Sequence, residues 1–119
     1  MKKNIEFTEI NNDFYEELEN TAIKLAAAER DLVIYTDGLG ALERRLMVEA
    51  DNLFYEKYKK RLSEALQRRD ARAREEYTRM IRATATAQEQ KTLLRCRYDM
   101  LKMKFEAWRT RSANKRGSA

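Results

Sequence analysis

Leucine recurs at every seventh position through the first half of the chain. Thr21, Ala28, Tyr35 and Leu42 stand at intermediate positions, so side chains of one seam follow one another in steps of three and four. This spacing places them on one face of an α-helix and is typical of a coiled coil. We predict a helix from about residue 12, capped by Asn11 or Asn12, with the leucines as an oligomer or partner interface. They are Leu18, Leu25, Leu32, Leu39, Leu46 and Leu53.

The stretch TDGLG, Thr36–Gly40, is the weakest point of this predicted helix. It holds two of the three glycines, and two glycines inside a helix cost together about 1.5–2 kcal/mol relative to alanine. The leucine phase crosses the stretch without a slip, which favours one continuous helix, with or without a kink. The alternative is a true break, with Gly38 capping the preceding helix in the left-handed conformation.

Downstream of this stretch, residues 40–82 have the propensity of an uninterrupted helix. The small and β-branched side chains of Ala83–Thr86 lower that propensity, and Thr86 followed by Glu89 fits a capping box that restarts a helix. We therefore predict helices at 12–36, 40–82 and 87–113, the first two continuous in the favoured interpretation. They form a single helical domain, residues 12–113, between a flexible polar lead-in (1–11) and a flexible basic tail (114–119).

The last predicted helix carries two adjacent apolar seams. Together they make a stripe that is wider than a two-stranded coiled coil uses, so the helix should pack against two neighbours. These are either two parts of the N-terminal region, or one such part and a second subunit. Phe105 and Trp108 are then core residues or interface anchors. The first seam is Leu94, Tyr98, Leu101, Phe105 and Trp108, and the second is Leu93, Cys96, Met100, Met103 and Ala107.

Composition agrees with an all-α protein. The 119 residues contain no proline, and 38% are charged and 43% apolar, which is typical of long helices or coiled coil. We expect a long antiparallel helical hairpin or an elongated three-helix arrangement with coiled-coil packing. The charge is divided: residues 1–56 hold 13 acidic and 6 basic side chains, and residues 57–119 hold 7 acidic and 19 basic. Such asymmetry indicates either packing between complementary helices or a basic surface for an acidic partner.

Catalytic and metal chemistry is not indicated. The chain has no histidine, the commonest general base and metal ligand, and a single cysteine, Cys96, cannot form a zinc site or an internal disulfide. Thr36–Gly40 lacks the spacing of a phosphate-binding loop. We predict no enzyme, no cofactor and no metal. There is no signal peptide or membrane-spanning run, so we expect a cytoplasmic protein that does not contact a membrane.

The best functional lead is a group of arginines in the middle of the chain. Arg61, Arg68, Arg72 and Arg79 are spaced by 7, 4 and 7 residues, which places them on one face of a continuous helix. Together with Arg69, this column matches a phosphate backbone or an acidic partner. No recognition motif accompanies it, so nucleic-acid contact should be independent of sequence. The alternative is a solvated face, balanced by nearby carboxylates and by the acidic N-terminal helix.

A resemblance extends this expectation. The restart at Thr86–Glu89 and the ending FEAWRTRSANKR, Phe105–Arg116, resemble short helical-hairpin proteins from the early regions of bacteriophages and prophages. The likeness covers about residues 20–116 and lies in the pattern, from which TDGLG and the arginine-rich middle depart. It implies a phage-type accessory protein in the host cytoplasm, acting on a nucleoprotein complex or as a host-defence antagonist such as an anti-CRISPR inhibitor.

Two hypotheses therefore stand. In the first, the chain binds a nucleic acid or nucleoprotein complex through the arginine face. In the second, it is a coiled-coil adaptor, scaffold or secretion chaperone that binds only protein, with a homodimer among the expected states.

Overall fold

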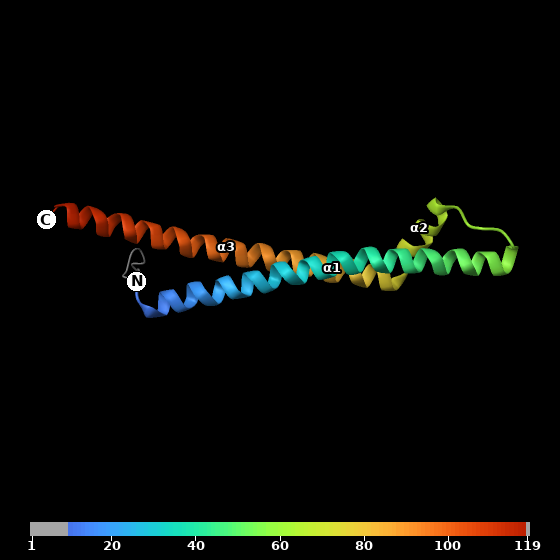
Figure 1. The fold of residues 1–119 in the computed structure, drawn as a ribbon, viewed down its shortest axis with the longest axis horizontal. Coiled ribbons are helices and arrows are strands. Elements are labelled where there is room, and N and C mark those ends of the chain that lie inside the picture. The colour runs from blue at the N-terminus through green and yellow to red at the C-terminus, as the bar shows by residue number, and fades with distance from the viewer. Residues whose placement is uncertain (1–9, 119) are drawn as a thin grey trace, which may run out of the picture. The chain divides into compact units, whose positions relative to one another are not determined.

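The computed structural model describes residues 10–118, and these are all-α (Figure 1). Helix α1 spans Asn12–Tyr58, α2 spans Glu64–Arg72 and α3 spans Glu75–Ser118. The predicted all-α class, a helical hairpin or three-helix arrangement, is confirmed. Contacts divide the chain into two units: unit 1 joins the residues up to Ala28 with those from Gln90 onward, and unit 2 is Glu29–Glu89. The predicted lead-in lies largely outside the described residues.

Helix α1 begins at an asparagine cap and does not stop at TDGLG. The backbone N–H of Phe14 donates to the Asn11 side-chain oxygen at 3.0 Å, so Asn11 is the cap. Gly38 and Gly40 both lie within α1, and no described glycine has a positive φ. The alternative with a true break is therefore wrong. Helix α1 is continuous because leucines pack in the same register before and after the glycines. This packing outweighs the lower helix propensity of Gly38 and Gly40.

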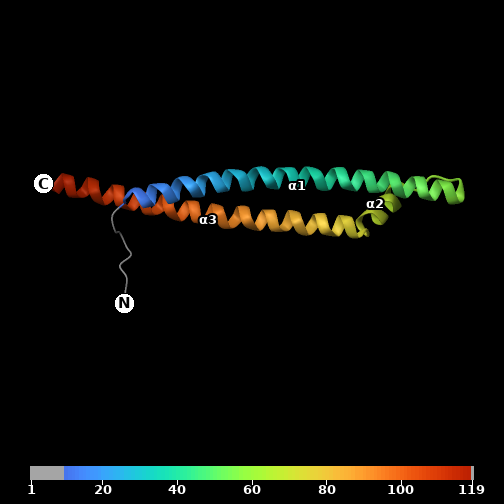
Figure 2. The same cartoon turned by 90° about the horizontal axis from the view of Figure 1, so that it is seen from below.

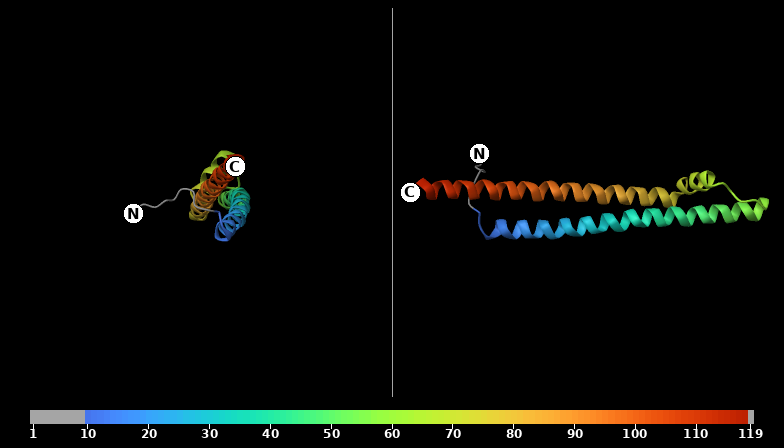
Figure 3. Two further views of the ribbon diagram at one scale, coloured as in Figure 1. Left: turned by 90° about the vertical axis from the view of Figure 1, so that its left-hand side faces the viewer. Right: turned by 45° about the horizontal axis from the view of Figure 1, so that its top comes forward.

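The chain reverses direction at residues 59–63, inside the predicted 40–82 helix, so the expectation of an uninterrupted helix is wrong (Figure 3). Lys59 takes a positive φ of 58°, and its N–H donates to the Tyr55 carbonyl at 2.7 Å, as in a left-handed C-cap. The Asp51 carboxylate then accepts from the Leu62 N–H at 2.8 Å. Ser63 caps α2. No propensity signal marks this point, because a lysine fills the position that glycine usually takes.

Helix α3 differs from prediction at both ends. It begins at Glu75, after a short link at Ala73 and Arg74, and it passes through Ala83–Thr86 without a break. The predicted restart at Thr86 is therefore wrong. Small side chains here reduce propensity only slightly, and Ala87 is buried, so packing maintains the helix. The helix continues to Ser118, which makes most of the predicted flexible tail helical.

In unit 1 the α1 and α3 segments lie antiparallel and meet through aromatic rings (Figure 2). The Phe14 and Phe105 rings stack with centroids 6.5 Å apart. Phe105 also contacts Trp108, at 5.9 Å. Thr21, Leu25 and Leu101 are buried. Of the two seams on α3, the one that ends in Phe105 and Trp108 is the one that faces α1.

Unit 2 has a smaller, aliphatic core. Leu46 and Ala71 are fully buried, and Tyr77 is nearly so. One residue comes from each helix, so this cluster fixes α2 and the start of α3 on α1. Leu39, Leu42 and Met47 pack against it.

Candidate interaction surfaces

The five predicted arginines do not form one column. Arg61 lies in the connection after α1, Arg68, Arg69 and Arg72 lie on α2, and Arg79 lies on α3. The spacing argument required a single continuous helix, and the reversal at residues 59–63 removes that condition. This part of the prediction is corrected.

Two of these arginines pair with carboxylates of α1. The Arg72 guanidinium donates to the Glu43 carboxylate at 2.5 Å, and this hydrogen bond, followed by the Coulombic attraction of Glu43, raises the pKa of Arg72. Arg61 lies 3.3 Å from Asp51. The acidic first half of the chain therefore neutralises part of the basic second half within the molecule, as the alternative interpretation expected.

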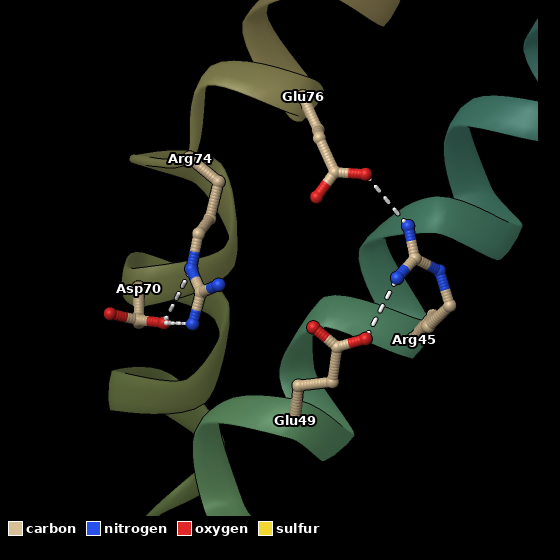
Figure 4. Close-up of polar contacts among 5 residues, drawn as sticks. All are labelled: Arg45, Glu49, Asp70, Arg74 and Glu76. Atoms are coloured by element: carbon tan, nitrogen blue, oxygen red, sulfur yellow. Dashed lines mark hydrogen bonds and ion pairs between the residues drawn. The ribbon is translucent and has the colours of Figure 1, made fainter. Parts of the chain in front are cut away.

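Other ion pairs of unit 2 do not divide by the two halves of the chain (Figure 4). Arg45 reaches Glu49 on its own helix at 2.7 Å and Glu76 on α3 at 2.9 Å. The Glu76 hydrogen bond is the larger cause of the raised pKa of Arg45. Arg74 lies 3.1 Å from Asp70. Only the Arg45–Glu76 pair joins two helices, and because both of its side chains are about half exposed, it contributes little to stability.

Three of the predicted arginines have no carboxylate partner among residues 10–118. These are Arg68, Arg69 and Arg79, which lie on two different helices. Arg68 is half-buried, and the other two are exposed. They present basic charge to solvent, but not as a continuous track.

A second basic region lies in unit 1, on α3. Residues 90–118 hold nine basic and two acidic side chains, whereas residues 10–28 hold one basic and four acidic. Arg97 pairs with Glu17 across the two helices. The Lys104 ammonium lies 5.9 Å from the Phe14 ring centroid. An open hollow between the helices is lined by Asp13, Glu16, Glu17, Asn20, Thr21, Lys24, Leu94 and Arg97.

The leucine seam is largely occupied within the chain. Leu25 and Leu46 are buried, whereas Leu18, Leu32 and Leu39 are half-buried. Only Leu53 is exposed, at 57%. After Leu46 the buried positions step by four to Ala50 and then to half-buried Phe54, which turns Leu53 outward. Half-buried Phe105 and Trp108 belong to the aromatic cluster of unit 1.

The large side chains of the second predicted seam of α3 are exposed, and Ala107 at its end is half-buried. Leu93, Met100 and Met103 are 63%, 67% and 69% exposed, and Cys96 is also exposed. Their spacing of three and four residues makes them one row on α3, beside the seam that faces α1. We call Leu93, Cys96, Met100, Met103 and Ala107 the outer stripe. A shallow hollow beside it is lined by Asp99, Lys102, Met103 and Glu106.

The same outward positions of α3 are polar in unit 2. The positions that precede the outer stripe by multiples of seven residues lie on the same side of α3. Four of them are charged residues and one is a threonine. This contrast within one helix shows that an outward-facing position needs no apolar side chain. The polar residues are Glu75, Arg79, Arg82, Thr86 and Glu89.

No metal-binding cluster of three or more histidine, cysteine or carboxylate side chains occurs within residues 10–118. In the same range no helix is long and apolar enough to cross a membrane. Comparison of the chain with known protein families, with characterised proteins and with solved structures finds no match. The class that the fold defines is an all-α helical hairpin with an exposed apolar stripe on its last helix.

Proposed function

We propose that the chain is a non-enzymatic interaction module that binds a protein helix through the outer stripe. The observation that carries the proposal is the exposure of Leu93, Met100 and Met103 on a face whose continuation in unit 2 is polar. Exposed apolar side chains that occur singly need no explanation, but a row at helical spacing is what a helix-binding surface presents.

The size of the outer stripe limits the strength of this association. Fully burying a leucine or methionine side chain contributes about 1.5–3 kcal/mol, and the stripe offers three large side chains that are already one-third covered. Association itself costs about 4–15 kcal/mol. The apolar contact therefore supports reversible binding, and charged neighbours must contribute to both affinity and orientation.

Site-specific photo-crosslinking tests this function. A photoreactive residue replaces Met103 in the outer stripe or, as the matched control, Thr86 at an outward position of the polar stretch. In a lysate of the source cells, we expect discrete adducts from position 103 and none from position 86. Equal labelling at both positions, or no adduct from position 103, would contradict the proposal.

A second candidate function is sequence-independent binding of a nucleic acid by α3 in unit 1. The observation that favours it is the excess of nine basic over two acidic side chains in residues 90–118. Lys102, Arg109 and Arg116 follow one another at steps of seven, as one basic column. The phage-type accessory or inhibitor role implied by the resemblance would use such a surface.

Salt dependence tests the second candidate. The logarithm of the affinity for single- or double-stranded DNA should fall with the logarithm of salt concentration by about 0.7–0.9 for each phosphate contacted. Replacing Lys102, Arg109 and Arg116 with glutamate should abolish binding. The matched control replaces Arg68, Arg69 and Arg79 with glutamate and should retain it. Binding that does not respond to salt, or that is lost only in the control, would exclude this function.

A further inference from the structure

We infer that the partner of the outer stripe is the same stripe of a second copy, with the two α3 helices parallel. This inference rests on the proposed function, because it identifies the helix that the outer stripe binds. It concerns only residues 92–111, all of which belong to unit 1. The arrangement leaves the buried contact of Leu101 with α1 intact. The Lys104 ammonium, which lies 5.9 Å from the Phe14 ring centroid, and the Glu106 carboxylate, which lies 3.6 Å from Arg109, would turn toward the partner subunit.

The outer stripe has the layout of a coiled-coil seam. Leu93, Met100 and Ala107 follow one another at steps of seven, and Cys96 and Met103 stand three residues after the first two. These are the a and d positions of a heptad, the two that face a partner helix. The seam is short, because the outward positions preceding Leu93 are polar, which confines the apolar contact to about two heptads.

Charges on the two sides of the outer stripe have opposite sign. In the heptad of this seam, the e positions are Arg97, Lys104 and Arg111, all basic. The g positions on the other side include Asp99 and Glu106, both acidic. Residues at e and g flank the contact between two coiled-coil helices and form ion pairs across it. A helix with one basic and one acidic flank is therefore complementary to a copy of itself in one orientation only.

The parallel orientation brings opposite charges together. In a parallel pair, a g residue faces the e residue five positions further along the partner helix. Asp99 then faces Lys104 of the partner subunit, and Glu106 faces Arg111 of the partner subunit. Two-fold symmetry repeats both pairs. An antiparallel pair would place e against e and g against g, so that basic side chains faced basic ones and acidic faced acidic. Charge complementarity thus selects a second copy and its direction.

Other occupants fit these features less well. A nucleic acid would leave Leu93, Met100 and Met103 exposed, because phosphates contact cations rather than methionines. The exposed side chains of α1 in unit 1 that surround Ile23 are mostly polar, among them Glu16 and Glu19, so α1 offers no apolar row that could pair with the stripe in a second copy.

The native thiol provides a direct test of orientation. In the parallel arrangement Cys96 occupies a d position and faces Cys96 of the partner subunit across the symmetry axis, close enough for a disulfide. Oxidised glutathione, which accepts the two electrons released, should convert the protein to a covalent dimer at concentrations where sedimentation shows association. The matched control, Cys96→Ala with Lys102→Cys, places the only thiol at an exposed c position away from the seam, and should remain monomeric on denaturing gels.

A charge exchange tests the ion pairs independently. Asp99→Lys places a lysine opposite Lys104 of the partner subunit twice in each dimer, and should weaken association about tenfold. Adding Lys104→Asp restores opposite charges and should recover most of the affinity. In an antiparallel dimer, Asp99 would face an acidic g residue of the partner subunit, so Asp99→Lys should not weaken association. Circular dichroism at low concentration verifies that each variant is folded.

The outcomes separate this inference from the proposed function. A dimer that is abolished by Met100→Glu but gives no Cys96 disulfide would overturn the parallel arrangement and leave the outer stripe as an interface. A monomer at every concentration, with adducts to another protein from position 103, would overturn the second copy as partner and leave the function. A dimer unaffected by Met100→Glu would overturn both.

Discussion

Residues 75–89 and 93–107 of α3 both bury side chains at helical spacing, but they differ in the side chains that they expose to solvent. In residues 75–89, Tyr77 and Ala87 are buried, Tyr77 against Leu46 of α1, and the outward positions are polar. In residues 93–107, Leu101 is likewise buried, but the outward positions form the outer stripe. The inward heptad accounts for the folding of the chain on itself. Within residues 10–118 the outward side chains Leu93, Met100 and Met103 stay exposed, which is why we propose an intermolecular role for them.

The cores behind these stretches also differ. Unit 2 is built on Leu46, Ala71 and Tyr77 and is bordered by ion pairs between α1 and the later helices. Unit 1 relies on stacked aromatic rings, and one ion pair between its helices is Glu17–Arg97. Point substitutions in the two units should therefore have separable consequences for stability and for association.

The largest expected effect on stability is in the core of unit 2. Leu46→Ala should lower the free energy of unfolding by about 3 kcal/mol, because Leu46 is fully buried and its removal leaves a cavity. Leu53→Ala is the matched control on the same seven-residue phase, and should cost less than about 1 kcal/mol, since Leu53 is exposed. Urea titration followed by circular dichroism measures both. Equal losses of stability would mean that Leu53 is as important to the core as Leu46, contrary to their difference in burial.

A smaller effect is expected in the aromatic cluster of unit 1. Phe105→Ala should destabilise the protein by about 2 kcal/mol, less than a fully buried phenylalanine would lose, because Phe105 is half-buried. Met103→Ala, two residues earlier and exposed, should change the stability of the dilute monomer by less than about 0.5 kcal/mol. Fluorescence of Trp108 during urea unfolding gives both values. A larger loss from Met103 would show that the outer stripe belongs to the core.

The glycines of α1 should be replaceable with a gain in stability. An added Cβ at Gly38 would lie 3.9 Å from the Met80 side chain, and one at Gly40 would lie 3.7 Å from Arg44, both ordinary contacts. The double variant Gly38→Ala with Gly40→Ala should gain about 1.5–2 kcal/mol, since alanine favours the helix. Thermal unfolding tests this. A loss of stability would mean that α1 is interrupted here.

The smallest effect is expected at the chain reversal. Lys59→Gly should stabilise unit 2 by about 1 kcal/mol or less, because Lys59 has a positive φ that glycine adopts without steric cost. Lys60→Gly, next to it, serves as the control and should bring no gain. Urea midpoints compare the two variants. Equal urea midpoints for the two variants would mean that Lys59 is not the residue with positive φ at the reversal.

Much of the fold could be predicted from the sequence, and the exceptions have physical causes. The leucine phase predicted the continuity of α1, because register depends on the whole helix, while two glycines make only a local contribution. The chain reversal could not be predicted, because the residue with positive φ that ends α1 is Lys59. A glycine at this position would have indicated the end of the helix. The restart predicted at Thr86 was wrong because the residues of a capping box can also occur inside a continuous helix. Here the helix continues, and Ala87 is buried within it.

The candidate surfaces were predicted less completely for related reasons. The arginine column depended on one uninterrupted helix, so the missed reversal also removed the column. The two seams of the last helix were visible in the spacing alone. Which seam faces inward could not be predicted, because Leu94 and Leu93 are equally apolar, and only the contacts of Phe105 with Phe14 settle the matter.

The central claim is that the outer stripe of α3 is an interface, and sedimentation equilibrium tests it most directly. Wild type, Met100→Glu and Thr86→Glu are compared from about 1 μM to about 1 mM, a range that covers reversible association of this strength. Both variants add one negative charge at equivalent outward positions. We predict that wild type and Thr86→Glu form a dimer as concentration rises, and that Met100→Glu remains monomeric. Equal behaviour of the two variants would contradict the claim.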